Sequence, residues 1–392
     1  MFRIAFLLSV LASILSFGAR AQNAAPARAT VLNVTSMDPA VDPCSDFFTY
    51  SCGGWLKNNP IPPDKTSWGV TGKLWEDNKL LLRQILETAA KGSSGQEPVK
   101  QKIGDYYAAC MDETAIEAAS ARPLKNVLDQ IARMHSKRNI AQVAASMRGL
   151  NVPFEFQSDQ DYKNSSQVIA EVDQGGLGLP DRDYYFKTDA KSVELRQAYV
   201  AHVQKMFELL GDAPAVAAGE AQTVLRIETA LANGSLTQVE RRDPKMLYHK
   251  MTIKDLEALS PSFAWKKYFS LSGEARLQSL NVAAPDFFKA MNATLKKEDL
   301  DNWKAYLRWQ WVNANAPYLS SAFVNADFEF FGKTLSGTQE LQPRWKRCVN
   351  YVDNDLGEAL GQAYVERAFP PEAKQRAQKL VKQIEAAMQQ DI

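Results

Sequence analysis

Helical periodicity runs through most of the chain and is the feature that most restricts its possible folds. From residue 74 to residue 91, apolar residues recur every three or four positions, and the pattern stops before the glycine and serine loop signal at 92–95. The same spacing predicts further helices, one of them ending near residue 134 and the others over 99–119, 140–150, 191–210, 215–232, 284–296 and 299–315. We therefore expect a mainly α, multi-helix lobe.

One stretch departs from the helical period. The segments 153–157 and 168–172 alternate apolar and polar residues, and the polar segment 159–166 separates them. Alternation over a few residues is typical of half-buried strands. We expect a small β-hairpin near 153–172 as the principal strand element.

The N-terminus has the features of a secretory signal peptide. Residues 1–3 supply a positive start, residues 4–18 carry no charge, and residues 19–21 (Ala-Arg-Ala) fit a small-x-small cleavage site. The apolar stretch is shorter than the about 20 residues that a membrane helix needs. We expect residues 1–21 to be removed and residues 22–40 to form a flexible leader. The mature chain is then secreted or periplasmic, without a stable membrane anchor.

Composition and charge are those of an ordinary globular protein. The chain has 46 basic and 45 acidic residues, a net charge of +1, and 45% hydrophobic residues. A nucleic-acid-binding protein normally shows a basic excess or a basic stripe. We therefore expect no nucleic-acid partner.

A glycine-rich stretch, DQGGLGLPDRDYY at 173–185, is a candidate for either a turn or a phosphate-binding loop. A P-loop needs Gly-Lys-Ser/Thr leading into a helix, and neither the lysine nor the hydroxyl is present here. The dinucleotide-binding fingerprint is also missing. We interpret the stretch as a structural turn.

The three histidines do not have the spacing of a metal site. His135, His202 and His249 form no pair at i and i+4, none precedes a glutamate as in a zinc-peptidase helix, and the chain has no Cys-x-x-Cys pair. We interpret them as surface or packing residues. No Gly-x-Ser-x-Gly nucleophile elbow is present either. From its residues alone, the chain shows no catalytic group and no metal ligand.

The four cysteines are Cys44, Cys52, Cys110 and Cys348. In an oxidising compartment they can form disulfides, and four cysteines allow three connectivities, which spacing leaves open. A local Cys44–Cys52 bridge needs Cα atoms within about 7 Å, whereas eight helical residues span about 12 Å. That bridge would therefore require the segment to bend.

Four ordered stretches resemble the neprilysin and endothelin-converting enzyme family of zinc metallopeptidases. They are VDPCSDFFTYSCGGWLKNNPIPPDKTSWG at 41–69, IGDYYAACMDE at 103–113, DQGGLGLPDRDYY at 173–185 and LQPRWKRCVNYVDNDLGEALGQAYVERAF at 341–369. The resemblance extends from about residue 40 to the end of the chain. It implies part of a secreted or surface-facing endopeptidase that hydrolyses peptides of limited size inside a mostly helical, two-lobed shell.

The family's zinc site is a His-Glu-x-x-His helix with a downstream Glu ligand, and the first Glu is the general base for a zinc-bound water. The motif does not occur in this sequence. The resemblance therefore implies zinc as the cofactor of a full-length member, with no zinc bound and no activity in this chain alone. It also favours a Cys110–Cys348 disulfide and leaves Cys44 and Cys52 unpaired here, for cysteines of the catalytic part.

One position departs from the family pattern. In members that release dipeptides from a free C-terminus, an arginine after the Ile-Pro pair grips the substrate carboxylate. Ser67 stands at that position, and Gly72 replaces a nearby acidic residue. Because a hydroxyl cannot replace a bidentate guanidinium, we expect an endopeptidase preference without a strong demand for a free carboxyl end.

The last segment carries an apolar stripe through Leu380, Ile384 and Met388, which predicts a helix that needs a packing partner. No Gly or Asn cap follows it. We expect residues 41–392 to be the N-terminal helical region of a longer enzyme, truncated at its C-terminal end, or a shortened gene product. Two functions stay open: the substrate-restricting part of a zinc metalloendopeptidase, and a non-catalytic peptide-binding or scaffold protein derived from the same family.

Overall fold

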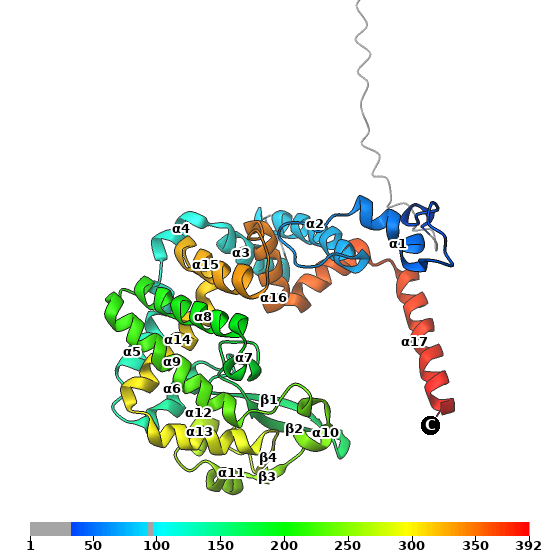
Figure 1. The fold of residues 1–392 in the computed structure, drawn as a ribbon. Coiled ribbons are helices and arrows are strands. Elements are labelled where there is room, and N and C mark those ends of the chain that lie inside the picture. Colours follow the sequence, from blue (N-terminus) through cyan, green and yellow to red (C-terminus); the bar gives the residue numbers. More distant parts are fainter. Residues whose placement is uncertain (1–32, 93–96, 392) are drawn as a thin grey trace, which may run out of the picture. The chain divides into compact units, whose positions relative to one another are not determined.

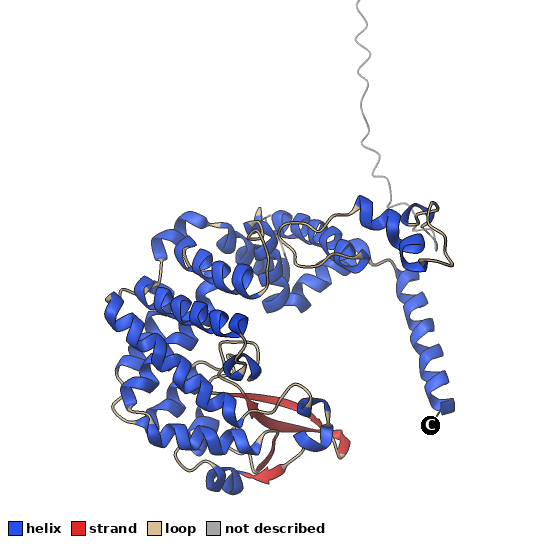
Figure 2. Cartoon of the chain, viewed as in Figure 1, coloured by secondary structure: helices blue, strands red, loops and turns tan. Residues whose placement is uncertain are grey.

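The computed structural model describes residues 33–92 and 97–391, and it divides into two compact units, one ending at Ile61 and the other beginning at Pro62. The expected signal peptide and the first part of the expected leader lie outside the described residues. Helices make up most of the described chain (Figure 2), so the prediction of a mainly α fold is confirmed.

The smaller unit contains the 3-10 turn η1 (Val34–Ser36) and helix α1 (Phe47–Asn58). Asp46 caps α1 because its carboxylate accepts a hydrogen bond from the backbone N–H of Thr49 at 3.0 Å. Asp38 donates its backbone N–H to the carbonyl of Tyr50 at 2.7 Å, and its carboxylate pairs with Lys57 at 2.5 Å. The last part of the expected leader is therefore bonded to α1.

In the larger unit, three long helices share one hydrophobic core: α2 (Val70–Ala90), α3 (Pro98–Met111) and α16 (Arg344–Ala368). They lie side by side in Figure 1. The helix expected over 99–119 is two helices, because α3 ends at Met111 and α4 (Glu113–Ala119) begins after Asp112. The Asp112 carboxylate accepts from the backbone N–H of Ala115 at 3.0 Å, and this cap starts the new helix.

A second group of long helices packs around two hydrophobic cores that are rich in aromatic residues. It includes α8 (Ala190–Leu209), α9 (Pro214–Gly234), α13 (Pro285–Lys297) and α14 (Leu300–Asn315), and their ends agree with the predicted ones within two residues. The shorter helical elements of the larger unit are η2 (Arg122–Leu124), α5 (Lys125–Ala132), η3 (Lys137–Asn139), α6 (Ile140–Ser146), α7 (Asp183–Phe186), η4 (Glu240–Arg242), α10 (Pro244–Leu247), α11 (Ile253–Leu259), α12 (Trp265–Leu271), η5 (Ala316–Tyr318), α15 (Ser321–Asp327) and the π-helix η6 (Phe328–Leu335).

The predicted hairpin is present as β1 (Phe154–Asp161) and β2 (Asn164–Gln174). It belongs to a sheet of four strands in the order β1-β2-β4-β3, with β3 (Lys250–Thr252) and β4 (Ser279–Val282). Strand β4 pairs parallel to β2 and antiparallel to β3. The two added strands have three and four residues, too few for an alternating pattern to show in the sequence.

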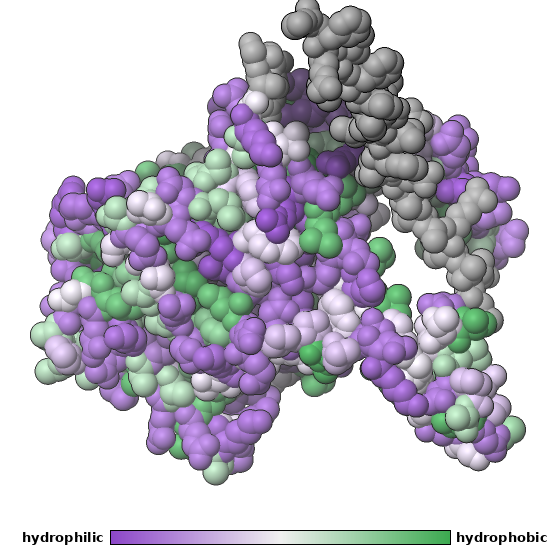
Figure 3. All heavy atoms as spheres, turned by 90° about the horizontal axis from the view of Figure 1, so that it is seen from above, coloured by the Kyte–Doolittle hydropathy of each residue, from purple (hydrophilic) through white to green (hydrophobic). Residues whose placement is uncertain are grey.

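Helix α17 (Pro371–Asp391) keeps its apolar stripe uncovered in the structure. Leu380, Ile384 and Met388 are 58%, 51% and 59% exposed. Other hydrophobic residues also reach the surface, and Figure 3 shows them interspersed among hydrophilic ones on the face drawn there. Within residues 33–92 and 97–391, no helix combines the length and the apolar character that crossing a membrane requires.

Candidate functional site

Residues 62–79, here called the 62–79 segment, lead from a loop into the first turns of α2. The loop folds back on itself where the backbone N–H of Lys65 donates to the carbonyl of Pro62 at 3.0 Å. The carbonyl of Pro63 accepts from the backbone N–H groups of Gln339 and Glu340 at 3.1 and 3.0 Å. The segment is thus tied to the chain just before α16.

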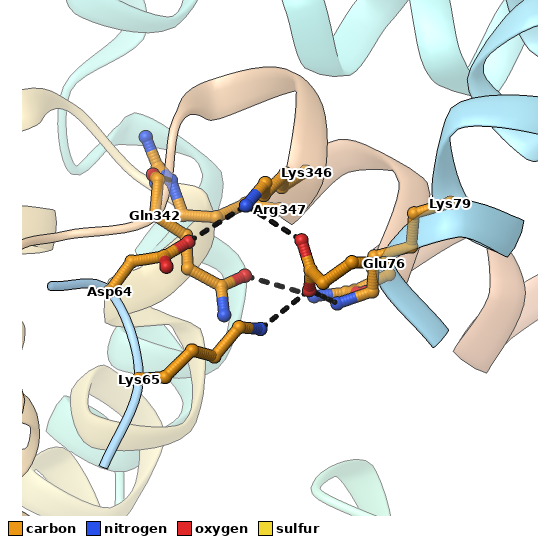
Figure 4. Close-up of polar contacts among 8 residues, drawn as sticks. Asp64, Lys65, Glu76, Lys79, Gln342, Lys346 and Arg347 are labelled. Atoms are coloured by element: carbon orange, nitrogen blue, oxygen red, sulfur yellow. Dashed lines mark hydrogen bonds and ion pairs between the residues drawn. The ribbon is translucent and has the colours of Figure 1, made fainter. Parts of the chain in front are cut away.

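Ion pairs tie the same segment to α16 itself, as Figure 4 shows. The ammonium of Lys346 lies 2.7 Å from one oxygen of Glu76 and 3.0 Å from Asp64. The other Glu76 oxygen accepts from Lys65 at 2.6 Å and from Lys79 at 3.2 Å. The five side chains keep only 9% to 18% of their exposure. We call these residues the Glu76 cluster.

The lysines of the Glu76 cluster stabilise the ionised form of the Glu76 carboxyl group. Burial alone would raise the pKa of Glu76, but the hydrogen bonds from Lys346 and Lys65 and the charge of Lys79 outweigh it and lower the pKa to about 2. The pKa of Lys346 is raised, because its hydrogen bonds to Glu76 and Asp64 outweigh the cost of burial. Three lysines surround two carboxylates, so Glu76 stays charged at every physiological pH.

The rest of the 62–79 segment presents an apolar surface to solvent. Val70, Leu74 and Trp75 are 70%, 57% and 66% exposed on the first turns of α2. Exposed apolar side chains on a segment that other contacts hold in place are typical of a recognition surface.

Ser67, the position that departs from the family pattern, is exposed, and Gly72 lies beside the indole of Trp68. A Cβ atom at Gly72 would lie 3.3 Å from that ring, so an acidic side chain there would require the indole to shift. The surface presents a hydroxyl and indole rings, and no guanidinium at position 67.

A model of peptidase family M13 matches residues 43–392. The chain belongs to peptidase family M13. Endothelin-converting enzyme 1 of Bos taurus is 33% identical over 376 residues, which are 92% of this chain and 49% of that protein. Neprilysin-3 of Drosophila melanogaster is 32% identical over 380 residues, 91% of this chain and 48% of that protein. The resemblance to the neprilysin and endothelin-converting enzyme family is therefore confirmed.

Solved structures agree with this family assignment. Zinc metalloprotease Zmp1 of Mycobacterium tuberculosis, in complex with an inhibitor, superimposes with a TM-score of 0.83 at 31% identity, over 91% of this chain and 54% of that one. The chain spans about half the length of the curated relatives it matches.

The three histidines of this M13 chain lie apart from one another. His135 is exposed, and the Nδ1 atom of His249 lies 3.1 Å from the carbonyl of Val282. His202 is buried and stacks on Phe330 at 5.1 Å, and burial lowers its pKa to about 4. Among the described residues, no group of three or more His, Cys, Asp or Glu side chains is placed to hold a metal ion.

The structure joins Cys110 of α3 to Cys348 of α16, with their Cα atoms 5.8 Å apart. Cys44 is exposed and Cys52 is half-buried on α1, and the described chain contains no disulfide to either of them.

The glycine-rich loop at 173–185 encloses a buried carboxylate that no sequence pattern had singled out. Glu228 of α9 is fully buried. It accepts hydrogen bonds from the hydroxyls of Tyr199, at 2.7 and 2.9 Å, and Tyr185, at 2.9 Å, and from the backbone of Gly178. Trp309 and Gln310 donate to it from α14 at 3.2 and 3.0 Å.

These contacts explain the glycines of the loop. Gly176 has φ of +71°, and its carbonyl accepts from Tyr306 at 2.8 Å, while a Cβ at Gly178 would lie 2.0 Å from the Tyr199 hydroxyl. Burial raises the pKa of Glu228 to about 7, against the opposing effect of its hydrogen-bond donors. The loop therefore has a structural role. Neither the helical period around Glu228 nor the charge of a single glutamate could have revealed the cluster.

Proposed function

We propose that this chain is the N-terminal, substrate-restricting part of a zinc metalloendopeptidase that hydrolyses peptides in a secreted or periplasmic setting. The observation that carries the proposal is the 62–79 segment. Its apolar residues face solvent while the Glu76 cluster and the bonds to Pro63 hold it against α16. The family resemblance supports the proposal, because the arginine that binds the substrate carboxylate in some members aligns with Ser67 of this segment.

The zinc of the M13 enzymes does not fit the residues of this chain. Its only imidazoles stand on separate elements, and the one that is buried, His202, sits among Trp309, Phe330 and Phe331 instead of carboxylates. A zinc site needs three or four nitrogen, sulfur or oxygen ligands within about 2.0–2.3 Å of one point. We therefore assign no step of the hydrolysis to residues of this chain, and its role is to bind and select substrate.

Substrate selection follows from the chemistry of the exposed surface. Val70, Leu74 and Trp75 can bury the apolar side chains of an extended peptide. Ser67 can exchange hydrogen bonds with a peptide backbone but supplies no charge to a terminal carboxylate. The surface of the 62–79 segment should therefore favour cleavage within peptides and should itself discriminate little between a free and an amidated C-terminus.

The first test is to read the coding DNA past the codon for Ile392. The proposal expects an open frame that reaches His-Glu-x-x-His. A frame that stops before this motif would contradict it and leave the non-catalytic scaffold as the function.

The second test uses the enzyme encoded by that frame. Ser67→Arg should raise kcat/KM for a peptide with a free C-terminus at least tenfold relative to its C-terminal amide, because it adds a bidentate carboxylate partner. Thr66→Arg is the matched control, since Thr66 is the exposed neighbour. Equal effects at the two positions would show that residue 67 does not face the substrate.

A further inference from the structure

A pocket that is separate from the apolar surface of the 62–79 segment opens between the end of α3, helix α4, η5 and the first turns of α16. Its volume is about 260 Å³, and its walls include the three tyrosines Tyr106, Tyr318 and Tyr351 and the two arginines Arg344 and Arg347. Three regions distant in the sequence thus build one concave site.

Among the described residues, both pocket arginines donate their Nε–H groups to neutral carbonyl groups. The Nε–H of Arg344 donates to the carbonyl of Cys110 at 2.8 Å, and the Nε–H of Arg347 donates to the carbonyl of Gln342 at 3.2 Å. In the part of the chain that the structure describes, no carboxylate lies within ion-pairing distance of either side chain. Lys346, which lies between them in the sequence, has two carboxylate partners. The pocket therefore holds two positive charges that no ion pair neutralises.

Two acids near the pocket accept hydrogen bonds from other groups, and a third, Asp327, is close enough to Tyr351 that, after burial, its charge helps to raise the pKa of that phenol. Asp355 accepts a hydrogen bond from the hydroxyl of Tyr106, and Glu117 accepts from the backbone N–H of Ser321 at 2.6 Å. In the described structure none of these three carboxylates forms an ion pair with Arg344 or Arg347, so both guanidinium groups can pair with an anion from outside.

The aromatic wall is fixed in place. The rings of Tyr318 and Tyr351 lie 4.5 Å apart, and the hydroxyl of Tyr351 donates to the carbonyl of Pro317 at 3.1 Å. Tyr318 is 45% exposed and Ile116 adds an apolar side chain to the lining. A small hydrophobic group can therefore bury its surface here while an attached anion meets the arginines.

We propose that this pocket binds the free carboxylate of a peptide whose last residue is hydrophobic. Planar guanidinium groups pair with carboxylates through two parallel hydrogen bonds, and this pairing favours a carboxylate over a neutral amide. The pocket is smaller than the about 300–1,000 Å³ of common small-molecule sites, so it admits one or two residues of the peptide end. Because the binding requires no zinc, it can be tested on this chain independently of the proposed peptidase function.

Titration calorimetry of the full chain at low ionic strength tests the proposal with N-acetyl-L-phenylalanine as the probe. The carboxylate should bind, and N-acetyl-L-phenylalaninamide should bind at least tenfold more weakly. Equal binding of acid and amide would overturn the role of the charge. Inorganic phosphate or 3-phenylpropionate binding as tightly as the probe would overturn recognition of a peptide end, and would identify a general anion or aromatic-acid site instead.

Variants locate the site. Arg344→Gln combined with Arg347→Gln should weaken binding of the probe at least tenfold, whereas Arg276→Gln, in an exposed turn, should leave it unchanged. Hydrogen exchange of the unmodified chain gives an independent readout, because the probe should slow exchange in 106–116 and 344–351. Undiminished affinity of the double variant, or protection confined to other regions, would contradict the proposal.

Discussion

Replacing Glu76 by glutamine should loosen the 62–79 segment from α16. The substitution keeps the size of the side chain but removes the carboxylate that Lys65, Lys79 and Lys346 share. Three ammonium groups then lie close together, and of the two carboxylates of the cluster Asp64 alone remains, paired with Lys346. The segment loses its strongest electrostatic tie, while the backbone bonds to Pro63 remain.

The magnitude follows from the lowered pKa of Glu76. A change from 4.5 to about 2 corresponds to about 3 kcal/mol of preference for the ionised form in the folded chain. The side chain retains 15% of its exposure, so water screens part of this interaction. We therefore expect a loss of about 1–2 kcal/mol, which is a factor of about 5–30 in a local opening equilibrium.

Hydrogen exchange measures this opening directly. The amides of Gln339 and Glu340, which donate to Pro63, should exchange about 5- to 30-fold faster in Glu76→Gln at pH 7. The matched control is Asp77→Asn, because Asp77 is the next residue, is 56% exposed and pairs only with Lys73 at the surface. An exposed pair of this kind is worth about 0.3–0.5 kcal/mol, so the control should change exchange by about twofold.

The pH dependence fixes the cause. Because the folded pKa of Glu76 is depressed, its contribution is fully present above about pH 4.5 and is lost as pH falls toward 2. After correction for intrinsic exchange, unmodified chain and Glu76→Gln should therefore converge between pH 4.5 and 2. Equal effects of Glu76→Gln and Asp77→Asn at pH 7, or a difference that persists at pH 2, would show that the charge of Glu76 does not hold the segment.

Three further outcomes follow from the buried contacts. Gly178→Ala should destabilise the chain by about 1–3 kcal/mol in urea unfolding, because its Cβ would lie 2.0 Å from the hydroxyl of Tyr199. Gly219→Ala is the control, since that helical position has open space and the change should be neutral or stabilising. Equal losses of stability in the two variants would contradict this packing. Glu228→Gln should lower the free energy of unfolding by about 1–3 kcal/mol at pH 8, which is above the raised pKa of Glu228. The new amide N–H groups would face the buried donors Trp309 and Gln310. An unchanged urea midpoint would show that the carboxylate does not stabilise the fold. Reducing the Cys110–Cys348 disulfide, with a sequence separation of 238, should lower stability by up to about 5 kcal/mol, and non-reducing peptide mapping that recovers Cys110 as a free thiol in oxidised monomer would show the pairing to be wrong.

Long helices and the hairpin could be predicted because each repeats one period over many residues. Helices α8, α9, α13 and α14 were predicted within two residues of their ends for this reason. The break at Asp112 was not, since a side-chain cap in the middle of an apolar pattern leaves the period unchanged. The short strands β3 and β4 depend on pairing with β2, which no local pattern records.

In the candidate site, too, local motifs could be predicted from the sequence and tertiary contacts could not. The motif around Ser67 was visible in the sequence, but the Glu76 cluster joins residues about 280 positions apart and depends on how α2 meets α16. The Glu228 cluster likewise draws its donors from the glycine-rich loop, α8 and α14. Such clusters are products of tertiary packing, so a single sequence does not reveal them.

Zinc content and peptidase activity, measured together on the purified chain, test whether it can bind and select substrate without carrying the catalytic metal. After dialysis against zinc-containing and then zinc-free buffer, elemental analysis should find less than stoichiometric zinc, and a fluorogenic neprilysin-type peptide should remain uncleaved. One tightly bound zinc ion per chain, together with cleavage that a chelator abolishes, would show that this chain itself carries the catalytic metal site.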